Sequence, residues 1–292
     1  MFFRPHLDPS RSCIVSCALS GVVANRAQCP AIPYTPEEYA SEAKRAYDAG
    51  AAAVHIHARS RDGQPSFAVA DYQDIRDAIV AECPVIINFS TGALGVSVED
   101  RVAYLRAVRP AVAALNMGSM NYAKYNAAKK KFVFDFVFPN PHAEILQFVQ
   151  AMRDEQIRPE MECFDLGHVG SARVLADMGL VERPYVMSLV MGVVGGIPAT
   201  TENLVHMANQ LPDGAEWQVV GISRDQWRLC AAACSMGGNV RVGLEDNFYL
   251  RDGVMAASNG ELVEKVVRMV QDQGRTVADV TEARARLGTV WT

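Results

Sequence analysis

Two histidines, His55 and His57, stand two residues apart in a short apolar run of the sequence. Because side chains alternate between the two faces of a β-strand, both imidazoles point to one face, while Val54 and Ile56 point to the other. Two neighbouring imidazoles suit a divalent transition metal, and Zn²⁺ commonly takes two histidines and one carboxylate while leaving a position open for substrate. The pattern therefore predicts a metal site that needs a carboxylate as its third ligand.

The run at residues 239–246 supplies that carboxylate, together with a buried charge pair. Alternation along the run places Arg241 and Glu245 on one face, and Asp246 at the edge of the loop reaches the arginine after a bend. We expect Glu245 to be the third metal ligand. An arginine and an aspartate beside a metal are suited to proton transfer, and a structural salt bridge that closes the fold is the alternative.

Other polar residues end neighbouring apolar runs. Ser90, Thr91 and Gly92 offer hydrogen-bond donors and close backbone approach to a carboxylate or carbonyl oxygen, with a helix N-cap as the alternative for the two hydroxyls. Asn116 and Glu162 point into the same space if the alternation holds. Glu162 then relays a proton, orients a ligand or pairs with the nearby arginine.

Two weaker signals lie further along the chain. The glycine-rich segment at residues 192–201 runs into a predicted helix start, a place that favours anions such as a phosphate or a thioester oxygen. His168 follows the fifth apolar run, where it is either an acid at the rim of the site or a helix cap.

These residues need a scaffold, and the whole chain alternates apolar runs with amphipathic stretches. The predicted strands are residues 13–20, 52–59, 85–91, 112–118, 160–166, 185–191, 216–222 and 239–246. The predicted helices are residues 36–49, 70–82, 98–108, 141–156, 169–179, 201–210, 225–236 and 259–273. Eight strands that alternate with eight helices predict a single (β/α)8 barrel domain over residues 1–292, with its active site at the carboxyl ends of the strands. The first strand lacks the GxGxxG of a dinucleotide-binding fold.

Two segments exceed a minimal barrel. Residues 119–140 form an insertion after the fourth strand, and its alternating phenylalanines predict a hairpin that packs on the barrel or on another subunit. Residues 276–287 predict an extra C-terminal helix.

Composition excludes several classes of protein. Of 292 residues, 50% are hydrophobic and 21% are charged, and the net charge of −5 argues against nucleic acid as a partner. No apolar run is long enough to cross a membrane, and the N-terminus does not resemble a secretory signal. Seven cysteines without paired CxxC spacing indicate a reduced, cytoplasmic setting.

Several motifs, taken together and in order, resemble those of the β-keto acid cleavage enzymes. They are His55-Ile56-His57, Ser90-Thr91-Gly92, Leu115-Asn116-Met117-Gly118-Ser119, Glu160-Met161-Glu162, Gly192 to Pro198, and Gly243-Leu244-Glu245-Asp246-Asn247. Members of that family are zinc-dependent (β/α)8 barrels, usually tetramers, that condense a β-keto acid with acetyl-CoA and release acetoacetate and a new acyl-CoA. The resemblance implies a homo-oligomer that binds both small molecules.

The resemblance also assigns roles to individual residues. It implies that the metal ligands are His55, His57 and Glu245, that Arg241 and Asp246 together deprotonate the keto acid, that Ser90 and Gly92 hold the substrate, and that Glu162 assists. Zinc would make the carbon between the two carbonyl groups acidic enough for Asp246 to remove its proton.

Two positions depart from family members that act on an amino-bearing keto acid. Those members carry a glutamate where this chain has Val23 and a threonine where it has Ala114. A cationic amine would lose its counter-charge there, at a considerable desolvation cost. We therefore expect a neutral or apolar β-keto acid as substrate.

Two other functions remain open on the sequence. A metal-dependent hydrolase of the amidohydrolase type also uses an HxH pair on a barrel, but it places the pair on the first strand and adds a lysine on the fourth and histidines on the fifth and sixth. A non-catalytic barrel that binds acyl-CoA would have no need of the buried Arg241, Glu245 and Asp246.

Overall fold

The computed structural model describes residues 5–290, and its centre is a closed barrel of eight parallel strands. The strands follow one another around the barrel as β1 (Val15–Ala18), β2 (Ala53–Ile56), β3 (Ile86–Phe89), β4 (Val112–Asn116), β7 (Arg158–Cys163), β8 (Tyr185–Met191), β9 (Ala215–Gly221) and β10 (Asn239–Val242). Pairing of β10 with β1 closes the ring. The predicted (β/α)8 barrel is confirmed.

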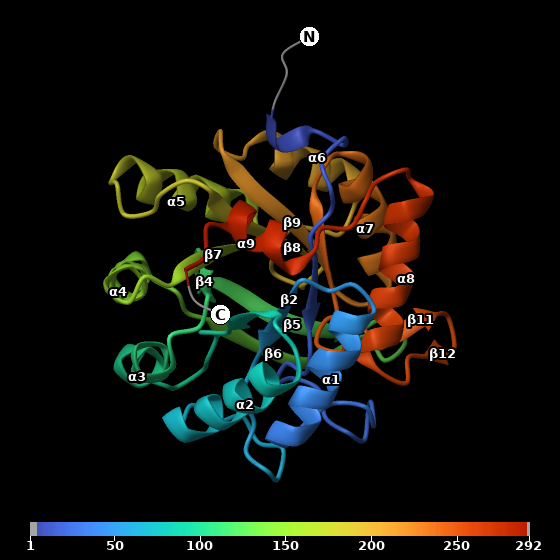
Figure 1. The fold of residues 1–292 in the computed structure, drawn as a ribbon, viewed down its shortest axis with the longest axis horizontal. Helices are drawn as coiled ribbons and strands as arrows, with labels where there is room; N and C mark the ends of the chain where they lie inside the picture. The colour runs from blue at the N-terminus through green and yellow to red at the C-terminus, as the bar shows by residue number, and fades with distance from the viewer. Residues whose placement is uncertain (1–4, 291–292) are drawn as a thin grey trace.

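Helices surround the barrel on its outside (Figure 1). They are α1 (Pro36–Asp48), α2 (Val69–Glu82), α3 (Val98–Val108), α4 (His142–Asp154), α5 (Leu166–Asp177), α6 (Thr201–Asn209), α7 (Gln226–Ser235) and α8 (Asn259–Asp272). Outward-facing strand residues such as Val54 and Ile56 are fully buried under these helices. The inward residues are thereby left to fill the barrel and to form its site.

Local sequence signals set the helix starts. Thr35 caps α1 by accepting a hydrogen bond from the Glu38 N–H, and the Glu38 side chain accepts one from the Thr35 N–H. By contrast, α5 begins at Leu166 rather than at residue 169, because the Asp165 side chain accepts from the Gly167 N–H and starts the helix early.

The predicted C-terminal helix is present as α9 (Val280–Leu287), which lies over the amino-terminal end of the barrel (Figure 1). Leu287 packs there in one cluster with Ile14, Val112 and Val186 from the barrel interior. Apolar packing of α9 therefore closes this end of the barrel, as burial of these side chains requires.

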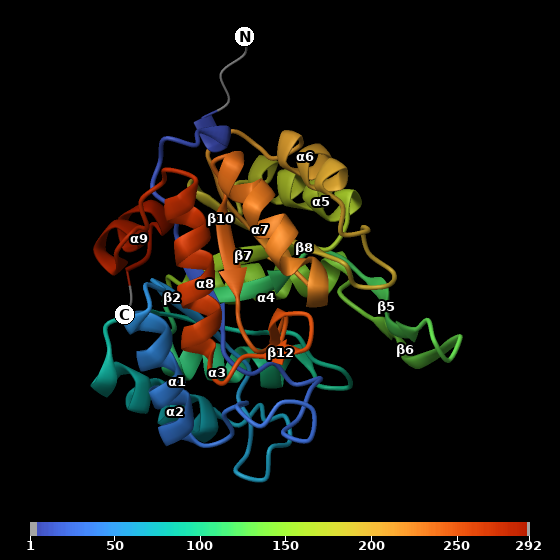
Figure 2. The same cartoon turned by 90° about the vertical axis from the view of Figure 1, so that its right-hand side faces the viewer.

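The insertion after β4 is a hairpin of β5 (Met120–Asn126) and β6 (Lys131–Phe138), which projects from the barrel in Figure 2. Phe138 is buried against Phe164, whereas Val133 and Val137 on the opposite face are mostly exposed. The predicted hairpin is confirmed, and one of its faces packs on the barrel.

One small hairpin was not predicted: β11 (Tyr249–Arg251) pairs with β12 (Val254–Met255) in the loop after β10.

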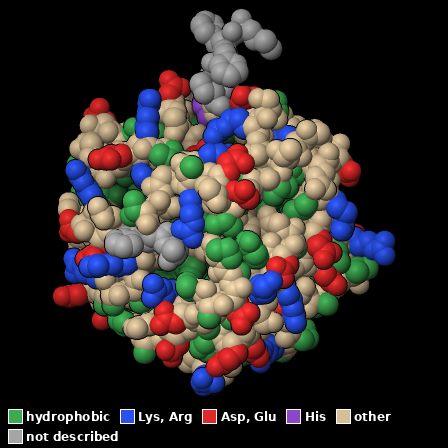
Figure 3. Space-filling view, viewed as in Figure 1, with side chains coloured by type: hydrophobic (Ala, Val, Ile, Leu, Met, Phe, Trp, Pro, Cys, Tyr) green, Lys and Arg blue, Asp and Glu red, His purple; other side chains and the backbone are tan. Residues whose placement is uncertain are grey.

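On the face drawn in Figure 3, acidic and basic side chains are interspersed. Within residues 5–290, every helix is too short or too polar to cross a membrane.

Candidate metal and proton-transfer site

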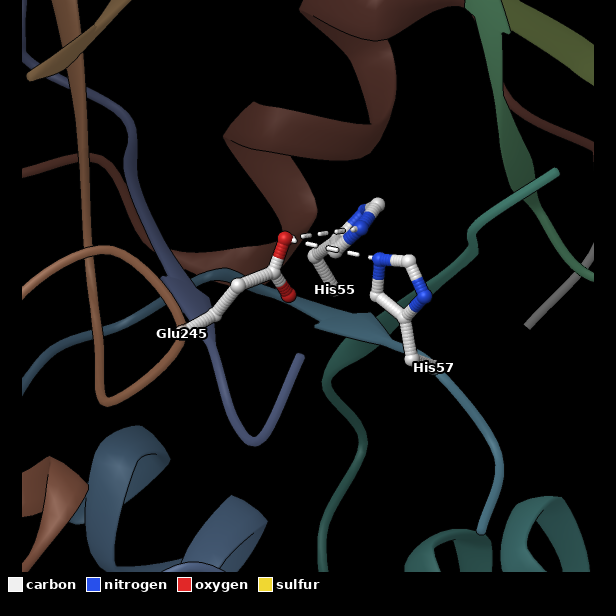
Figure 4. Close-up of side chains that lie close together, drawn as sticks. All are labelled: His55, His57 and Glu245. Atoms are coloured by element: carbon white, nitrogen blue, oxygen red, sulfur yellow. Dashed lines mark ion pairs between the residues drawn. The ribbon is translucent and has the colours of Figure 1, made fainter. Parts of the chain in front are cut away.

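His55, His57 and Glu245 converge at the carboxyl end of the barrel (Figure 4). Glu245 Oε1 lies 3.5 Å from His57 Nε2 and 3.8 Å from His55 Nε2. The three ligand atoms all lie within 4.8 Å of one another. His55 is 2% exposed, so its ring is fixed by packing.

The two sides of this cluster come from strands that are not paired with each other. β1 pairs with both β2 and β10, so it brings His55 and the β10 loop close together. The expected continuous strand to residue 246 is wrong: β10 ends at Val242, and Gly243 has φ +140°. A Cβ on Gly243 would stand 2.2 Å from the Ala18 carbonyl oxygen, so only glycine permits this turn toward the histidines.

The side chains fit a divalent metal with nitrogen and oxygen ligands. Glu245 Oε2 is buried and has no hydrogen-bond partner among the described residues, which is costly for a carboxylate oxygen unless a cation binds it. Burial opposes ionisation of Glu245, but Arg241 and the two imidazoles together hold its pKa well below the ordinary value. Burial lowers the pKa of His55 well below its usual value, which keeps that ring neutral, as a ligand must be.

Arg241 forms hydrogen bonds with Glu245 of the metal-binding group and with two further carboxylates. Its Nε and Nη2 donate to the two oxygens of Asp246 at 3.0 and 2.9 Å. Nη2 also donates to Glu245 Oε1 at 2.8 Å, and Nη1 donates to Glu162 Oε1 at 3.1 Å. The arginine therefore fixes three carboxylates around one buried guanidinium.

The single positive charge of Arg241 does not balance the negative charges of three buried carboxylates. Burial raises the pKa of Asp246 to about 6, despite the lowering effect of Arg241. Burial likewise raises the pKa of Glu162 to about 8. A carboxyl group with a pKa near neutrality is suited to accept and return a proton.

Four of the predicted substrate-binding residues lie at the carboxyl ends of β3 and β4, where Asn116 is the register partner of Glu162. Ser90 and Asn116 are buried on the inward face, and a Cβ on Gly92 would stand 3.6 Å from Ser90 Oγ and 3.7 Å from Asn116 Nδ2. The Gly92 N–H donates to Ser90 Oγ at 3.2 Å. Thr91 instead donates its hydroxyl to the Ala114 carbonyl at 2.6 Å, which joins the two strand ends.

The two positions that guided the substrate prediction differ in their surroundings. Ala114 is fully buried in β4, two residues before Asn116. Val23 lies in the loop after β1, and its side chain is 61% exposed to solvent rather than buried with the cluster.

His168 and the glycine-rich segment have structural contacts. His168 is buried in α5, and its Nδ1 accepts from the Phe164 N–H at 3.3 Å. In the segment after β8, the Ala123 N–H donates to the Val194 carbonyl at 3.1 Å, and the Ile197 N–H donates to the Phe164 carbonyl at 2.8 Å. The segment thus ties the projecting hairpin to the barrel.

Sequence analysis missed Tyr122 of β5. Burial raises the pKa of its hydroxyl, and the charges of Glu245, Asp246 and Glu162 raise it further. The hairpin therefore brings a phenol within electrostatic reach of the cluster. Nothing in the local sequence marks Tyr122, because its approach to the cluster depends on how the hairpin folds onto the barrel, where its ring lies 6.3 Å from that of Phe164.

Comparison with known proteins gives a consistent result. Residues 12–289 match the family model for beta-keto acid cleavage enzymes. The 3-keto-5-aminohexanoate cleavage enzyme of Acetoanaerobium sticklandii is 39% identical over 277 residues, which cover 94% of this chain and 97% of that enzyme. The 3,5-dioxohexanoate:acetyl-CoA acetone transferase of Paraburkholderia graminis is 32% identical over 95% of this chain and 96% of its own length. The solved apo structure of ObcA has the same fold, with a TM-score of 0.76 at 20% identity, over 89% of this chain and 66% of that protein.

Proposed function

Because the chain belongs to the beta-keto acid cleavage enzyme family, we propose that it is a zinc-dependent enzyme that converts a β-keto acid and acetyl-CoA into acetoacetate and a new acyl-CoA. The observation that carries this proposal is the bidentate Arg241–Asp246 pair beside a cluster of two histidines and a glutamate. Deprotonation next to a carbonyl group requires a proton acceptor beside a metal site, and these two groups of side chains are in contact.

His55, His57 and Glu245 would hold the metal, which acts as a Lewis acid that polarises the β-carbonyl group when bound. The Ser90 hydroxyl and the Asn116 amide bind and orient the carboxylate end of the keto acid, and Gly92, which has no side chain, leaves room for it. The acidic carbon then lies between the two carbonyl groups and faces the proton acceptor.

Asp246 takes the proton from that carbon. Its pKa of about 6 leaves it ionised near neutral pH, yet basic enough to hold the proton once it is transferred. Arg241 fixes both carboxylate oxygens and prevents the group from rotating away. Glu162, which shares the arginine, moves or stores a proton on the far side of the guanidinium.

The carbanion forms a new C–C bond to the acetyl carbon of acetyl-CoA and displaces the CoA thiolate. The thiolate attacks the original β-carbonyl carbon, and the adjacent C–C bond breaks. The carboxylate-bearing half, now acetylated, leaves as acetoacetate after it regains the proton from Asp246. The remaining acyl group leaves as the new acyl-CoA, so atoms and charge balance without a further reactant.

The substrate that we propose has a neutral or apolar side chain. Ala114 is fully buried and offers no polar group to the substrate. Phe138 adds an apolar surface, because its Cζ lies 3.4 Å from the position of a Cβ on Gly92. A cationic group beside these side chains would lose its hydration without a counter-charge.

The hydrolase alternative finds less support. β4 (Val112–Asn116) carries no lysine and β8 (Tyr185–Met191) no histidine, so the ligands of a second metal are missing from both strands.

The test is acetoacetate formation from acetyl-CoA and a panel of β-keto acids that differ in chain length and terminal charge, with protein before and after zinc removal. We expect activity on an uncharged, short-chain member, loss on zinc removal and recovery on its return. Preference for an amino or trimethylammonio substrate would contradict the substrate class. Folded, zinc-loaded protein that is inactive on every member would contradict the reaction.

A further inference from the structure

We propose that Asn88 and Glu160 are positioning residues that orient the His55 ring. Glu160 fixes the Asn88 amide, Asn88 Oδ1 accepts a hydrogen bond from His55 Nδ1–H, and the Nε2 lone pair of His55 then faces the metal. This inference rests on the metal cluster of the proposed function but not on the reaction. It gives a purpose to a group of buried polar side chains that neither bind the metal nor reach the substrate.

The barrel interior is unusual directly below the cluster. Ser16, Asn88, Glu160 and Gln218 come from alternate strands, β1, β3, β7 and β9, and line one small internal cavity. Bulky branched residues normally fill such a layer of a (β/α)8 barrel. A wholly polar layer is costly to bury, so its hydrogen bonds must serve another purpose.

Glu160 is the centre of that layer. It is 2% exposed, and it accepts hydrogen bonds from Asn88 Nδ2, Ser188 Oγ and Gln218 Nε2. Gln218 Nε2 also donates to Ser188 Oγ at 2.9 Å. Since an amide nitrogen donates and an amide oxygen accepts, the bond to Glu160 determines which end of the Asn88 side chain points away from it.

Asn88 stands next to His55 on the neighbouring strand. The two residues are register partners on the paired strands β2 and β3, and both side chains point inward. Asn88 Oδ1 and His55 Nδ1 are each buried, and within residues 5–290 neither makes a hydrogen bond, so a bond between them would satisfy both atoms.

A bond from Nδ1–H to Asn88 Oδ1 would fix the tautomer of the ring. His55 Nε2 is then the unprotonated nitrogen, and it is the nitrogen that lies 3.8 Å from Glu245 Oε1. Outer-shell partners of this kind orient metal-binding histidines, and their loss weakens metal binding about 10- to 100-fold.

Glu160 could instead bind a metal directly, since His55, Glu160 and Glu162 form a second group of closely spaced ligand atoms. The hydrogen bonds argue against this, because both Glu160 oxygens already accept from neutral donors. If Asn88 orients His55, substitution of Asn88 should weaken zinc binding more than Glu160→Gln does. If Glu160 binds the metal itself, Glu160→Gln should have the larger effect.

The first measurement is the zinc dissociation constant of metal-depleted protein, by competition with a chelating dye and without any substrate. We expect Asn88→Leu to weaken zinc binding about 10- to 100-fold. Glu160→Gln, which keeps one acceptor oxygen for Asn88, should have a smaller effect. Ser16→Ala, in the same layer but outside these contacts, should bind zinc as the wild type does.

The second measurement is proton NMR of the zinc-loaded wild type. We expect a downfield His55 ring N–H resonance that is protected from solvent exchange, and its absence from the wild type would overturn the proposal without any variant. Unchanged zinc affinity in folded Asn88→Leu would also overturn it. So would a larger loss of zinc affinity in Glu160→Gln than in Asn88→Leu. Weaker zinc binding by Asn88→Leu, with a wild type that is inactive on every keto acid, would support this inference while contradicting the proposed reaction.

Discussion

The two ends of the barrel each bury a charge cluster, and the clusters have opposite compositions. At the amino-terminal end, Glu216 is one carboxylate between two arginines, 2.6 Å from Arg11 and 2.5 Å from Arg286. At the carboxyl end, Arg241 is one arginine among three carboxylates. Both clusters are held by direct hydrogen bonds, and the central residues Glu216 and Arg241 are buried.

The composition of each cluster decides what it can do. Burial opposes ionisation of Glu216, but Arg286, Asn239 and Arg11 hold its pKa below the ordinary value, so it stays charged and joins α9 to the barrel. Burial raises the pKa of both Asp246 and Glu162, because a single arginine does not offset three buried carboxylates. An excess of cations makes a permanent structural link, and an excess of carboxylates makes a group that exchanges protons.

The largest effect is expected from Asp246→Asn. The amide has the same shape but cannot accept the proton, so kcat should fall about 10²- to 10⁴-fold while the protein stays folded. Acetoacetate formation measures the loss, and circular dichroism checks the fold. Glu216→Gln is the matched control, and its kcat should match the wild-type value. Equal losses in both variants would remove the distinction between the two clusters.

A second substitution tests the structural cluster. Arg286→Leu leaves Glu216 with only one of its two arginines, and we expect the free energy of unfolding to fall by about 3 kcal/mol with kcat unchanged. Urea denaturation measures the change. Arg106→Leu, an exposed arginine on α3, provides the control and should be nearly neutral. A loss of activity in folded Arg286→Leu would indicate that the two ends of the barrel are coupled.

The pH dependence of stability should also separate the two clusters, because the two slopes should have opposite signs. A lowered carboxyl pKa stabilises the fold above the unfolded value of 4.5, so the advantage of wild type over Glu216→Gln should disappear as pH falls through the folded pKa. A raised carboxyl pKa keeps the proton bound in the folded state. Metal-free wild type should therefore lose stability relative to Glu162→Gln as pH rises from 4.5 to about 8.

Urea unfolding of the three proteins at several pH values measures both slopes. Slopes of the same sign would contradict the assignment of the two clusters.

Much of the fold follows from local patterns in the sequence. Apolar runs that alternate with amphipathic stretches are local properties, so the eight strands, the insertion and the C-terminal helix were all predictable. The starts of α1 and α5 depend on single side chains, Thr35 and Asp165. The predicted start of α1 at residue 36 is correct, whereas that of α5 at residue 169 is three residues late.

The candidate site was predictable in part. Residues two apart on a strand share a face, so the His55 and His57 pair follows from spacing alone. Alternation in 239–246 gave the right neighbours for the wrong reason: Glu245 reaches the histidines through the turn at Gly243 rather than along the strand.

The sequence by itself determined the kinds of group that this protein brings together, because residue type and strand period are local. Only the tertiary structure decided the pairings across the barrel, such as Asn88 with Glu160 and Arg241 with Glu162, which join residues 72 and 79 positions apart. It also decided which carboxyl groups exchange protons. That property depends on burial and on the balance of neighbouring charges, which arise only when the ring of strands closes.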